Sequence, residues 1–532
     1  CEGLRHDRAT TTASLSSVCI DGRYHRDNCE RKTIPFPFVY SLRSLMFDDF
    51  SPRGKDNDEG MRYMYEINNR LHEELNACKN EISRFAYNRK WDRVKKLTND
   101  YELVSSSCCS FLDGGSSSTS SRCGVSAYNP ASRSFYKLWE ILVRFHGLLF
   151  QRDDGMRPLR VMFLAEGPGG FVEAFSTYRR RFFPPRAYIG DSLHGMTLKS
   201  PEKRVPYWNP PEQSRTRFRV HAGEDGTGDL CNVRNIAHMV ERVGKQACDL
   251  VTADGGFDFS HNYNTQEEVS TELVSCETFA ALQLLKNGGH FVLKIYDVRT
   301  DSTFRLIHLL RSLFTNLYFV KPLTSRPANS EKYLVCIGFR GASACSPHQD
   351  PSSIIPLFRE DIEQRTMNFM WTSQARGLRE MPVMLVREIV FYNAHYVSRQ
   401  TMIIRKTLEL IAAETNEERR DDDAEKAYQA SEMAMRQLSK CVRWCDKFKI
   451  PVRNGARETL AKAVMPKAAD VEEKYKFEEP ACKTCETEQQ KEHRQTAIIQ
   501  LKTDPADNLP CQPLTATPLT FHPLTSSGAV TQ

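Results

Sequence analysis

The stretch "VMFLAEGPGGFVEAF", residues 161–175, decides the fold. An apolar run ends at an acid, passes through a turn of glycine and proline at residues 167–170, and continues into a segment with helical spacing of apolar residues. Glycines let the backbone approach a ligand closely, and in open α/β sheets ligands bind beyond the carboxyl ends of the strands. The sequence therefore predicts an α/β domain whose first strand ends at a ligand pocket.

The same turn limits the kind of ligand. It does not fit the G-x-G-x-x-G pattern of dinucleotide-binding domains, and it lacks the Lys-Ser or Lys-Thr pair of a phosphate-binding P-loop. A dinucleotide or a nucleoside triphosphate is therefore disfavoured, whereas S-adenosylmethionine, which carries no phosphate, remains compatible. Because such turns also occur for purely structural reasons, other residues have to show whether this turn binds a ligand.

Short apolar strands alternate with helical stretches from about residue 129 to residue 340. This alternation is typical of a doubly wound α/β domain. The expected strands occupy residues 160–166, 187–191, 217–222, 248–254, 290–297, 316–322 and 332–339. The last two lie too close together for a crossover helix, which predicts an antiparallel hairpin at one edge of a seven-stranded, mostly parallel sheet.

Changes in composition divide the rest of the chain. Residues 59–104 carry apolar positions at mixed three- and four-residue spacing, which predicts one or two amphipathic helices. A Ser- and Gly-rich run predicts a linker, and a polar, proline-rich end predicts disorder. The expected organisation is an irregular segment 1–57, a helical region 58–104, a linker 105–128, the α/β domain 129–345, a helical region 346–478 and a disordered tail 479–532.

The overall composition is that of an ordinary globular protein. The 532 residues carry a net charge of +6, which is compatible with an RNA partner but does not establish one. Without a bilayer-spanning stretch or a signal-peptide core, we expect an intracellular protein, in the nucleus or cytoplasm, with no membrane partner. The 17 cysteines are scattered, as expected of reduced thiols, and the start at Cys1 predicts a truncated or processed chain. Cys482 and Cys485 lack the two further ligands of a closed zinc site, so no metal is expected.

Charged side chains gather at the expected ligand edge of the sheet. Asp254 ends the strand 248–254, Lys294 lies near the end of the next strand, and Glu331 directly precedes the last one. Upstream, Lys137 lies at the start of a predicted helix. Because the carboxyl ends of parallel strands meet at one edge, the sequence predicts that two lysines and two carboxylates meet beside the cofactor pocket.

In order and setting, these four residues resemble the K-D-K-E tetrad of the FtsJ-type ribose 2′-O-methyltransferases. The blocks "EGPGGFVEAF", "LHGMTLKS", "GEDGTGDL", "ADGGF", "GGHFVLKIYD" and "KPLTSRPANSEKYLVC" resemble those of the mRNA cap methyltransferases that modify the first transcribed nucleotide, in the same order. The approach to the domain also resembles enzymes of large DNA viruses. The resemblance implies a Rossmann-like class I methyltransferase fold flanked by helical extensions, S-adenosylmethionine as cofactor and capped RNA as partner, with the capping or transcription machinery as a candidate partner.

The resemblance also implies a role for each member of the tetrad. A ribose hydroxyl is a poor nucleophile at neutral pH, whereas a lysine beside another cation in a desolvated pocket has a lowered pKa and can act as a base. Lys294 is therefore the expected general base. Lys137 would hold the hydroxyl and supply the neighbouring positive charge, while Asp254 and Glu331 orient the two ammonium groups.

Binding residues follow from the same resemblance. The expected cofactor contacts are Ser132, Glu166, Gly167, Pro168, Gly169, Gly170, Phe171, Asp229, Leu230 and Asp254. The expected RNA contacts near the modified ribose are Asn264, Thr265, Gln266 and Asn329. A track for RNA phosphates and bases is expected at Lys199, Lys203, Arg204, Arg215, Arg217 and Arg219, interleaved with Tyr207, Trp208 and Phe218.

Two other functions stay open from the sequence. A ribosomal or transfer RNA 2′-O-methyltransferase would use the same tetrad on a different RNA, and a non-catalytic RNA-binding scaffold would keep the fold without turnover. The blocks "GMTLKS" and "SRPANSE" favour the cap enzymes. The intact tetrad argues against a scaffold.

Overall fold

The structure is a computed structural model. It describes residues 39–42, 55–85, 90–105, 124–150, 156–202, 205–209, 217–257, 259, 262–341, 351–364, 381–417 and 423–464. The tail predicted at 479–532, with its pair of cysteines, and most of the linker predicted at 105–128 lie outside these residues.

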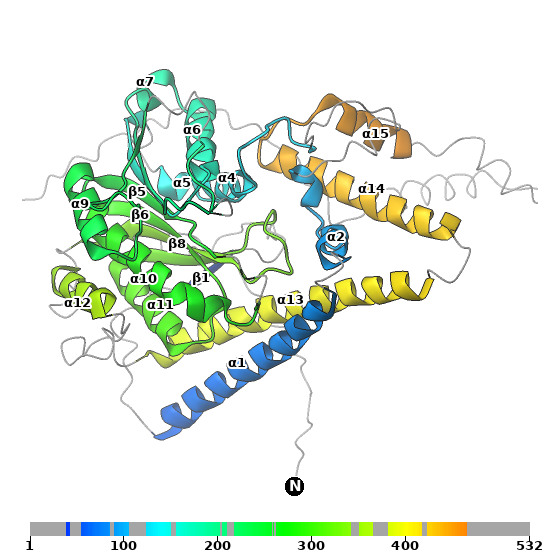
Figure 1. The fold of residues 1–532 in the computed structure, drawn as a ribbon, viewed down its shortest axis with the longest axis horizontal. Coiled ribbons are helices and arrows are strands. Elements are labelled where there is room, and N and C mark those ends of the chain that lie inside the picture. Colours follow the sequence, from blue (N-terminus) through cyan, green and yellow to red (C-terminus); the bar gives the residue numbers. More distant parts are fainter. Residues whose placement is uncertain are drawn as a thin grey trace, which may run out of the picture. The chain divides into compact units, whose positions relative to one another are not determined.

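The described residues are built around one sheet with the strand order β1-β7-β8-β6-β5-β2-β3-β4 (Figure 1). The strands are β1 (Val39–Leu42), β2 (Arg160–Leu164), β3 (Ser192–Met196), β4 (Phe218–Val220), β5 (Cys248–Ala253), β6 (Leu285–Ile295), β7 (Phe314–Val320) and β8 (Lys332–Phe339). From β6 to β4 all neighbours are parallel, whereas β8 runs antiparallel to both β6 and β7. The mostly parallel sheet with its hairpin of β7 and β8 is thereby confirmed.

Two expectations about strands are wrong. Residues 187–191 do not form a strand, because Pro185, whose fixed φ suits a first helical turn, opens the short helix α7 (Pro185–Tyr188), and β3 begins only at Ser192. The segment 1–57, expected to be irregular, contributes β1, which pairs antiparallel with β7. The sheet therefore has an eighth strand, and β1 rather than the hairpin forms its edge.

Helices cover both faces of the sheet (Figure 1). One face carries α4 (Ser134–Arg144), α5 (His146–Leu149) and α6 (Gly170–Phe182), and the other carries α9 (Val233–Val243), α10 (Gln266–Leu284) and α11 (Asp301–Leu313). Alternate residues of β2 divide between the two cores: Val161 and Phe163 pack with α4 and α6, whereas Met162 and Leu164 pack with α9 and α10. This alternation follows from the two-residue period of a strand.

Two long helices that are far apart in the sequence lie side by side (Figure 1). They are α1 (Lys55–Ile82) and α13 (Val383–Glu417), and together with α2 (Lys90–Leu97) they form a third apolar core. The short helix η2 (Ser83–Phe85) follows α1, and α12 (Pro351–Gln364) packs on α10. Helix α14 (Asp423–Lys447) packs on the short helix η3 (Glu102–Val104) and on α15 (Asn454–Val464). None of the helices in the described ranges is long and apolar enough to cross a membrane.

Candidate active site

The strand order places a crevice between the ends of β2 and β5. From β2 the sheet continues in one direction through β3 and β4 and in the other through β5 and β6, so the connections that follow these two central strands leave toward opposite faces. The backbone N–H of Asp254 donates to the carbonyl of Leu164 at 3.2 Å, which holds the end of β5 against the end of β2. Glu166 and Asp254 therefore flank the same point of the sheet edge.

The four predicted catalytic residues meet there as two ion pairs. Lys294 Nζ lies 3.1 Å from Asp254 Oδ1 and donates to the Asp254 carbonyl at 2.8 Å. Lys137 Nζ lies 2.7 Å from Glu331 Oε1. The side chains of both pairs are largely buried, so each charge is compensated by its partner rather than by water.

The pairing of β6 and β8 sets this geometry. Lys294 on β6 lies opposite Tyr333 on β8, and Glu331 immediately precedes β8. The hydroxyl of Tyr333 donates to Asp254 Oδ1 at 2.9 Å, so the carboxylate is held from β8 as well as from β6. Lys137 reaches the site from the first turns of α4.

The pKa of Lys294 differs from the lowered pKa expected of a general base. Burial alone would lower the pKa of Lys294, but Asp254, Tyr296 and Glu331 together outweigh burial, and the pKa lies above its usual value. Burial opposes ionisation of Glu331, but Lys137, Lys294 and Lys321 hold the pKa of that carboxyl well below its usual range. The pKa of Lys294 is thus raised, whereas the sequence predicted that it would be lowered.

Lys321 is a buried cation that the sequence did not single out. Its Nζ donates to Ser325 Oγ at 3.3 Å, to the Asn329 carbonyl at 2.6 Å and to the Glu331 carbonyl at 2.8 Å. Burial lowers the pKa of Lys321 to about 7. The only signal in the sequence was its position at the start of the block "KPLTSRPANSEKYLVC".

Glu277 on α10 is a second functional residue that the sequence did not reveal. It is fully buried, and its Oε1 accepts a hydrogen bond from the Gly255 N–H at 3.1 Å, directly after Asp254. Burial holds the pKa of this carboxyl well above its usual range, although Lys294 acts in the opposite direction. A Cβ at Gly255 would lie 2.3 Å from Glu277 Oε1, so a larger residue here would displace the Glu277 carboxylate.

The glycine-rich turn after β2 forms a cradle that fits a bound ligand. Gly169 has a φ of 113°, in the left-handed region that favours glycine. A Cβ at Gly170 would lie 2.2 Å from the hydroxyls of Ser132 and Ser134. Glu166 accepts a hydrogen bond from the Phe171 N–H, while its other oxygen, Oε2, is buried without a partner among the described residues. An unpaired buried acceptor beside such a turn fits the cationic methionine end of S-adenosylmethionine.

The residues predicted to contact adenine lie in a second glycine turn. A Cβ at Gly228 would lie 2.1 Å from the Thr197 carbonyl, and Leu230 is buried. Asp229 Oδ1 accepts a hydrogen bond from the Cys231 N–H at 2.9 Å, so this carboxylate stabilises the turn itself. Contact between Asp229 and a cofactor stays a prediction.

The predicted RNA contacts differ in accessibility. Asn329 is exposed and Thr265 is half-buried, whereas Gln266 is buried. Asn264 donates from Nδ2 to Asn80 Oδ1 on α1 at 2.7 Å. Helix α1, which the sequence assigned to a separate region, therefore contacts one of the predicted RNA-binding residues.

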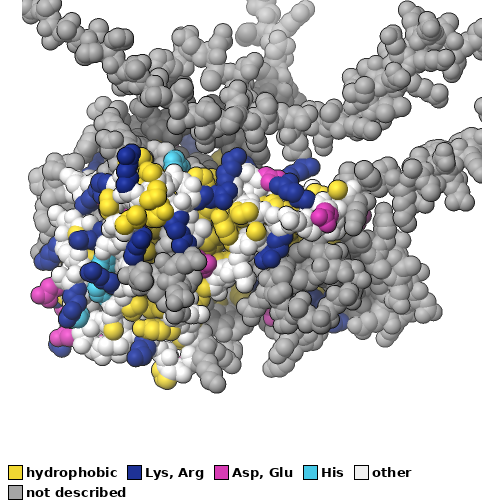
Figure 2. Space-filling model, turned by 90° about the horizontal axis from the view of Figure 1, so that it is seen from above, with side chains coloured by type: hydrophobic (Ala, Val, Ile, Leu, Met, Phe, Trp, Pro, Cys, Tyr) yellow, Lys and Arg dark blue, Asp and Glu magenta, His cyan; other side chains and the backbone are white. Residues whose placement is uncertain are grey.

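Half of the predicted basic track lies within the described residues. Lys199, Arg217 and Arg219 are exposed, whereas Lys203, Arg204 and Arg215 lie outside the described residues. Trp208 packs on Phe218 with ring centroids 4.8 Å apart, and Tyr207 is exposed. Figure 2 shows Lys and Arg side chains spread over the described surface seen from above, with few Asp and Glu side chains among them.

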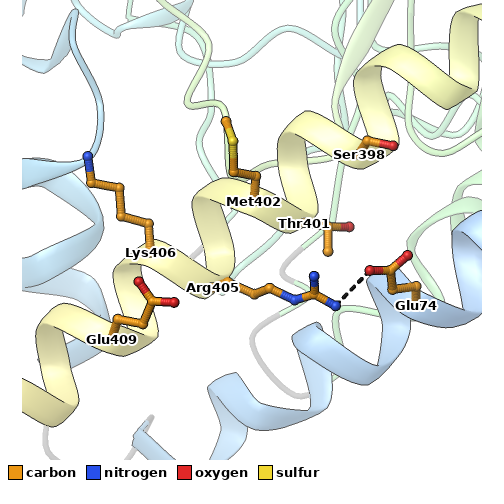
Figure 3. A pocket seen from close by; sticks show the side chains of 7 residues that line it. All are labelled: Glu74, Ser398, Thr401, Met402, Arg405, Lys406 and Glu409. Atoms are coloured by element: carbon orange, nitrogen blue, oxygen red, sulfur yellow. Dashed lines mark hydrogen bonds and ion pairs between the residues drawn. The ribbon is translucent and has the colours of Figure 1, made fainter.

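A cavity of about 510 Å³ lies away from these residues, between α1 and α13 (Figure 3). It is lined by Glu74, Ser398, Thr401, Met402, Arg405, Lys406 and Glu409. Arg405 crosses it to pair with Glu74 at 2.6 Å. None of the predicted site residues lines this cavity. Within the described ranges no three His, Cys, Asp or Glu side chains are grouped so that they could hold a metal ion.

Comparisons with known proteins concern the same part of the chain. Residues 130–339 match the family described as FtsJ-like methyltransferase. The cap-specific mRNA (nucleoside-2′-O-)-methyltransferase 1 of Mus musculus is 34% identical over 180 residues, which cover 33% of this chain and 20% of the mouse protein. The protein of the same name from Homo sapiens is 33% identical over 180 residues, covering 33% of this chain and 21% of the human protein.

A shorter relative extends the comparison to a distant organism. The cap-specific mRNA (nucleoside-2′-O-)-methyltransferase 1 of Trypanosoma cruzi (strain CL Brener) is 36% identical over 195 residues, covering 36% of this chain and 51% of that protein. The aligned part is thus between about a fifth and about half of each relative's length.

The match to the family includes every strand from β2 to β8 and the helix that carries Lys137. It therefore contains all four residues of the two ion pairs and the glycine-rich turn. Residues 130–339 form an FtsJ-like methyltransferase domain, and the methyl donor of that family is S-adenosylmethionine.

Proposed function

We propose that the protein is an S-adenosylmethionine-dependent mRNA cap 2′-O-methyltransferase that acts on the first transcribed nucleotide. The observation that carries this proposal is the meeting of two lysine–carboxylate pairs, Lys294 with Asp254 and Lys137 with Glu331, at the sheet edge where the glycine-rich turn ends. The names of the three relatives support capped mRNA as the substrate.

The chemistry assigns different tasks to the two lysines. When bound, S-adenosylmethionine supplies an electrophilic methyl group on a positively charged sulfur. The ribose 2′-oxygen has to approach that methyl group in line and has to lose its proton. Lys137, fixed by Glu331, donates a hydrogen bond that places the hydroxyl, and Lys294 accepts the hydroxyl proton at Nζ when it is in the amine form.

Asp254 controls when Lys294 is an amine. Its carboxylate is the largest of the groups that raise the pKa of Lys294 against the effect of burial. A positive charge bound near Asp254 would offset part of that carboxylate's effect and lower the pKa of Lys294. Cofactor binding and activation of the base are therefore coupled through Asp254.

Further contacts hold the side chains and turns around the tetrad in position. Tyr333 orients the Asp254 carboxylate, Glu277 holds the Gly255 N–H that follows it, and Lys321 holds the turn that ends at Glu331. The predicted cofactor residues of the 166–171 turn would hold the methionine end, with Glu166 Oε2 as an acceptor. Asn329, being exposed beside Glu331, is the best placed of the predicted RNA contacts.

The direct test is transfer of labelled methyl from S-adenosylmethionine to short RNAs that carry a 7-methylguanosine cap, an unmethylated cap or a bare triphosphate. We expect cap-dependent labelling on the 2′-oxygen of the first nucleotide, located by nuclease digestion and mass spectrometry. Lys294→Ala should lower the rate by about 10²–10⁴-fold, the usual contribution of a general base, without loss of cofactor binding.

Other outcomes would assign a different function. Labelling of uncapped, structured RNA would indicate a ribosomal or transfer RNA methyltransferase. Binding of S-adenosylmethionine without transfer to any of these RNAs would indicate a scaffold. A Lys294→Ala variant as fast as the unchanged protein would remove Lys294 as the base.

A further inference from the structure

A buried carboxylate outside the tetrad holds two arginines beside it. Glu102, in η3, is 2% exposed. Its Oε1 accepts hydrogen bonds from Arg133 Nη1 at 2.5 Å and Arg326 Nη2 at 2.8 Å, and its Oε2 accepts from Arg326 Nε at 3.0 Å. The two arginines come from the two segments that also supply Lys137 and Glu331 to the tetrad.

Two guanidinium groups share the carboxylate of Glu102. Burial opposes ionisation of Glu102, but hydrogen bonds and charge from Arg326 and Arg133 hold its pKa well below its usual range. Asn99 adds a neutral hydrogen bond to Oε2 at 2.7 Å. Glu102 therefore compensates both guanidinium groups, and Glu331 of the tetrad also acts on both of them.

Both arginines remain accessible while they are held in place. The side chain of Arg133 is 29% exposed and that of Arg326 is 24% exposed. Arg133 Nη2 also donates to the Thr324 carbonyl at 3.2 Å, which ties the start of α4 to the segment that contains Arg326. Arg133 Nε and Arg326 Nη1 donate to no acceptor among the described residues.

The location points to a specific kind of ligand. Arg133 follows Ser132 and lies one helical turn before Lys137, while Arg326 lies on the turn with the exposed Asn329. An RNA whose ribose is held between Lys137 and Lys294 brings a phosphate on each side of that ribose. A guanidinium that is fixed, partly exposed and short of an acceptor matches a phosphate in geometry and charge.

We propose that Arg133 and Arg326 form a binding site for an RNA phosphate next to the methylated ribose, with Glu102 fixing both guanidinium groups in position. The site rests on the proposed function, because it needs an RNA at the tetrad. Glu102 links substrate binding to the helical region 58–104, since η3 ends that region. The side chains are ordered before RNA arrives, which reduces the entropy lost on binding.

The test measures the affinity of the full chain for a short capped RNA at several salt concentrations. Each phosphate contact to a single strand contributes about 0.7 to the slope of log K against log salt. We expect Arg326→Met to weaken binding and to reduce that slope by about 0.7. Arg326→Lys keeps the charge and is expected to keep the slope while losing part of the affinity.

Arg157→Met is the matched control, because Arg157 also pairs with a carboxylate. Its partner Asp249, at 2.6 Å from Nη2, lies near the start of β5, whereas Asp254 follows the end of that strand. This variant should leave affinity and slope unchanged. If Arg326→Met lowers affinity as expected but leaves the slope unchanged, the arginine is only a structural tie and the phosphate site is wrong.

RNA with uncharged linkages provides a second test, which does not depend on the stability of the protein variants. Replacing the phosphates around the target ribose one at a time by methylphosphonates should weaken binding at one position in the unchanged protein. At that position, the methylphosphonate should cause little further loss of RNA affinity in the Arg326→Met and Arg133→Met variants. Full additivity at every position would overturn the proposal. Absence of methyl transfer to any RNA by the unchanged protein would instead overturn the proposed function, so the two failures are distinguishable.

Discussion

At the scale of single residues, the site depends on how buried charges are shared. Lys294 is held as an ammonium by Asp254, whereas Lys321 is buried among carbonyl and hydroxyl oxygens and has a pKa of about 7. Burial favours the neutral amine in both cases. At Lys294 the surrounding groups, with Asp254 first, together outweigh burial, whereas at Lys321 the Glu331 carboxylate does not. The identity of the general base is therefore a property of the pair and of what binds beside it.

The first prediction concerns the pH dependence of methyl transfer. The proposed base, Lys294, has to be in its amine form, and its pKa is raised, so kcat/KM for S-adenosylmethionine should rise with pH throughout the accessible alkaline range. The profile of kcat should reach its plateau at a lower pH, since a bound cation lowers the pKa of Lys294. Initial rates between pH 6 and pH 10 measure both profiles, and identical profiles would contradict the coupling through Asp254.

The second prediction concerns Glu277→Gln and stability. The pKa of the buried Glu277 carboxyl is raised, so the folded protein binds more protons than the unfolded chain above the usual carboxyl pKa. Stability is therefore lost as pH rises through that window. Glutamine stays neutral and still offers an oxygen to the Gly255 N–H, so the variant should be more stable than the unchanged protein at pH 8 and equally stable near pH 4. Urea unfolding at the two pH values compares them, and a variant less stable at pH 8 would refute the assignment.

At the scale of elements, the accessory helices hold the segments that line the site. Asn80 on α1 accepts a hydrogen bond from Asn264, and Gln400 on α13 donates to the Ala328 carbonyl at 3.0 Å and to Ser330 Oγ at 3.1 Å. The exposed Asn329 lies between the last two residues. The helices thus act on the predicted RNA contacts from outside the methyltransferase domain.

The third prediction tests this through Gln400→Ala. Loss of two hydrogen bonds to the 328–330 turn should raise KM for capped RNA by at least about 5-fold, because a typical net hydrogen bond contributes about 0.5–1.5 kcal/mol. Binding of S-adenosylmethionine should not change. Arg405→Ala, on the same helix but in the cavity of Figure 3, is the control and should alter neither quantity. Equal effects of the two variants would mean that α13 acts only through general stability.

The fourth prediction concerns the ion pair that joins α1 to the catalytic strand. Lys79 Nζ lies 2.8 Å from Asp297 Oδ2, both side chains are buried, and Asp297 follows Lys294 by three residues. Lys79→Met would leave Asp297 buried with only Lys332 at 3.8 Å, and should cost about 3–5 kcal/mol of unfolding free energy. Denaturant unfolding measures this cost. Arg62→Met, which removes an exposed pair with Glu66 on the same helix, should leave stability unchanged.

The elements show what the sequence could predict. Six of the seven expected strands lie where the apolar runs placed them, and most of these runs are buried within the sheet. The strand expected at 187–191 failed because Pro185 favours a helical turn there, and β1 was missed because its pairing with β7 depends on a partner far along the chain.

In the site, too, some residues are marked by a local sequence pattern, whereas others are placed by contacts with residues far along the chain. The tetrad was predictable because its carboxylates and Lys294 lie at strand ends, and strand ends converge. Glu277 and Lys321 carry no local pattern that marks them. Their roles come from contacts made after the chain has folded, namely with Gly255 and with the carbonyls of the 325–331 turn.

At the scale of the whole molecule, the methyltransferase domain shares its cores with helices outside it. Tyr392 of α13 stacks on Phe319 of β7 with ring centroids 4.1 Å apart. Trp444 of α14 donates to the buried carboxylate of Glu140 on α4 at 3.1 Å. The domain boundary drawn from sequence at 129–345 therefore cuts through packed interfaces.

The fifth prediction concerns truncation. Residues 129–345 expressed alone should unfold at a lower temperature than the full chain and should bind hydrophobic dyes, because both aromatic interfaces would be exposed to water. A chain ending at residue 464 keeps every described element and should unfold at the temperature of the full chain. Thermal unfolding of the three proteins compares them. A fragment as stable as the full chain would show that the helices contribute little.

The pairing of β1 with β7 has a consequence for how the sheet meets other molecules. A sheet edge presents unpaired N–H and C=O groups that another chain can extend, which leads to aggregation. At one border β1 occupies that position along β7, from Val39 opposite Val320 to Leu42 opposite Leu317. At the other border β4 has only three residues, with the exposed Arg219 at its centre. A short added strand at one border and a short, basic one at the other thus protect the catalytic sheet against edge-to-edge association.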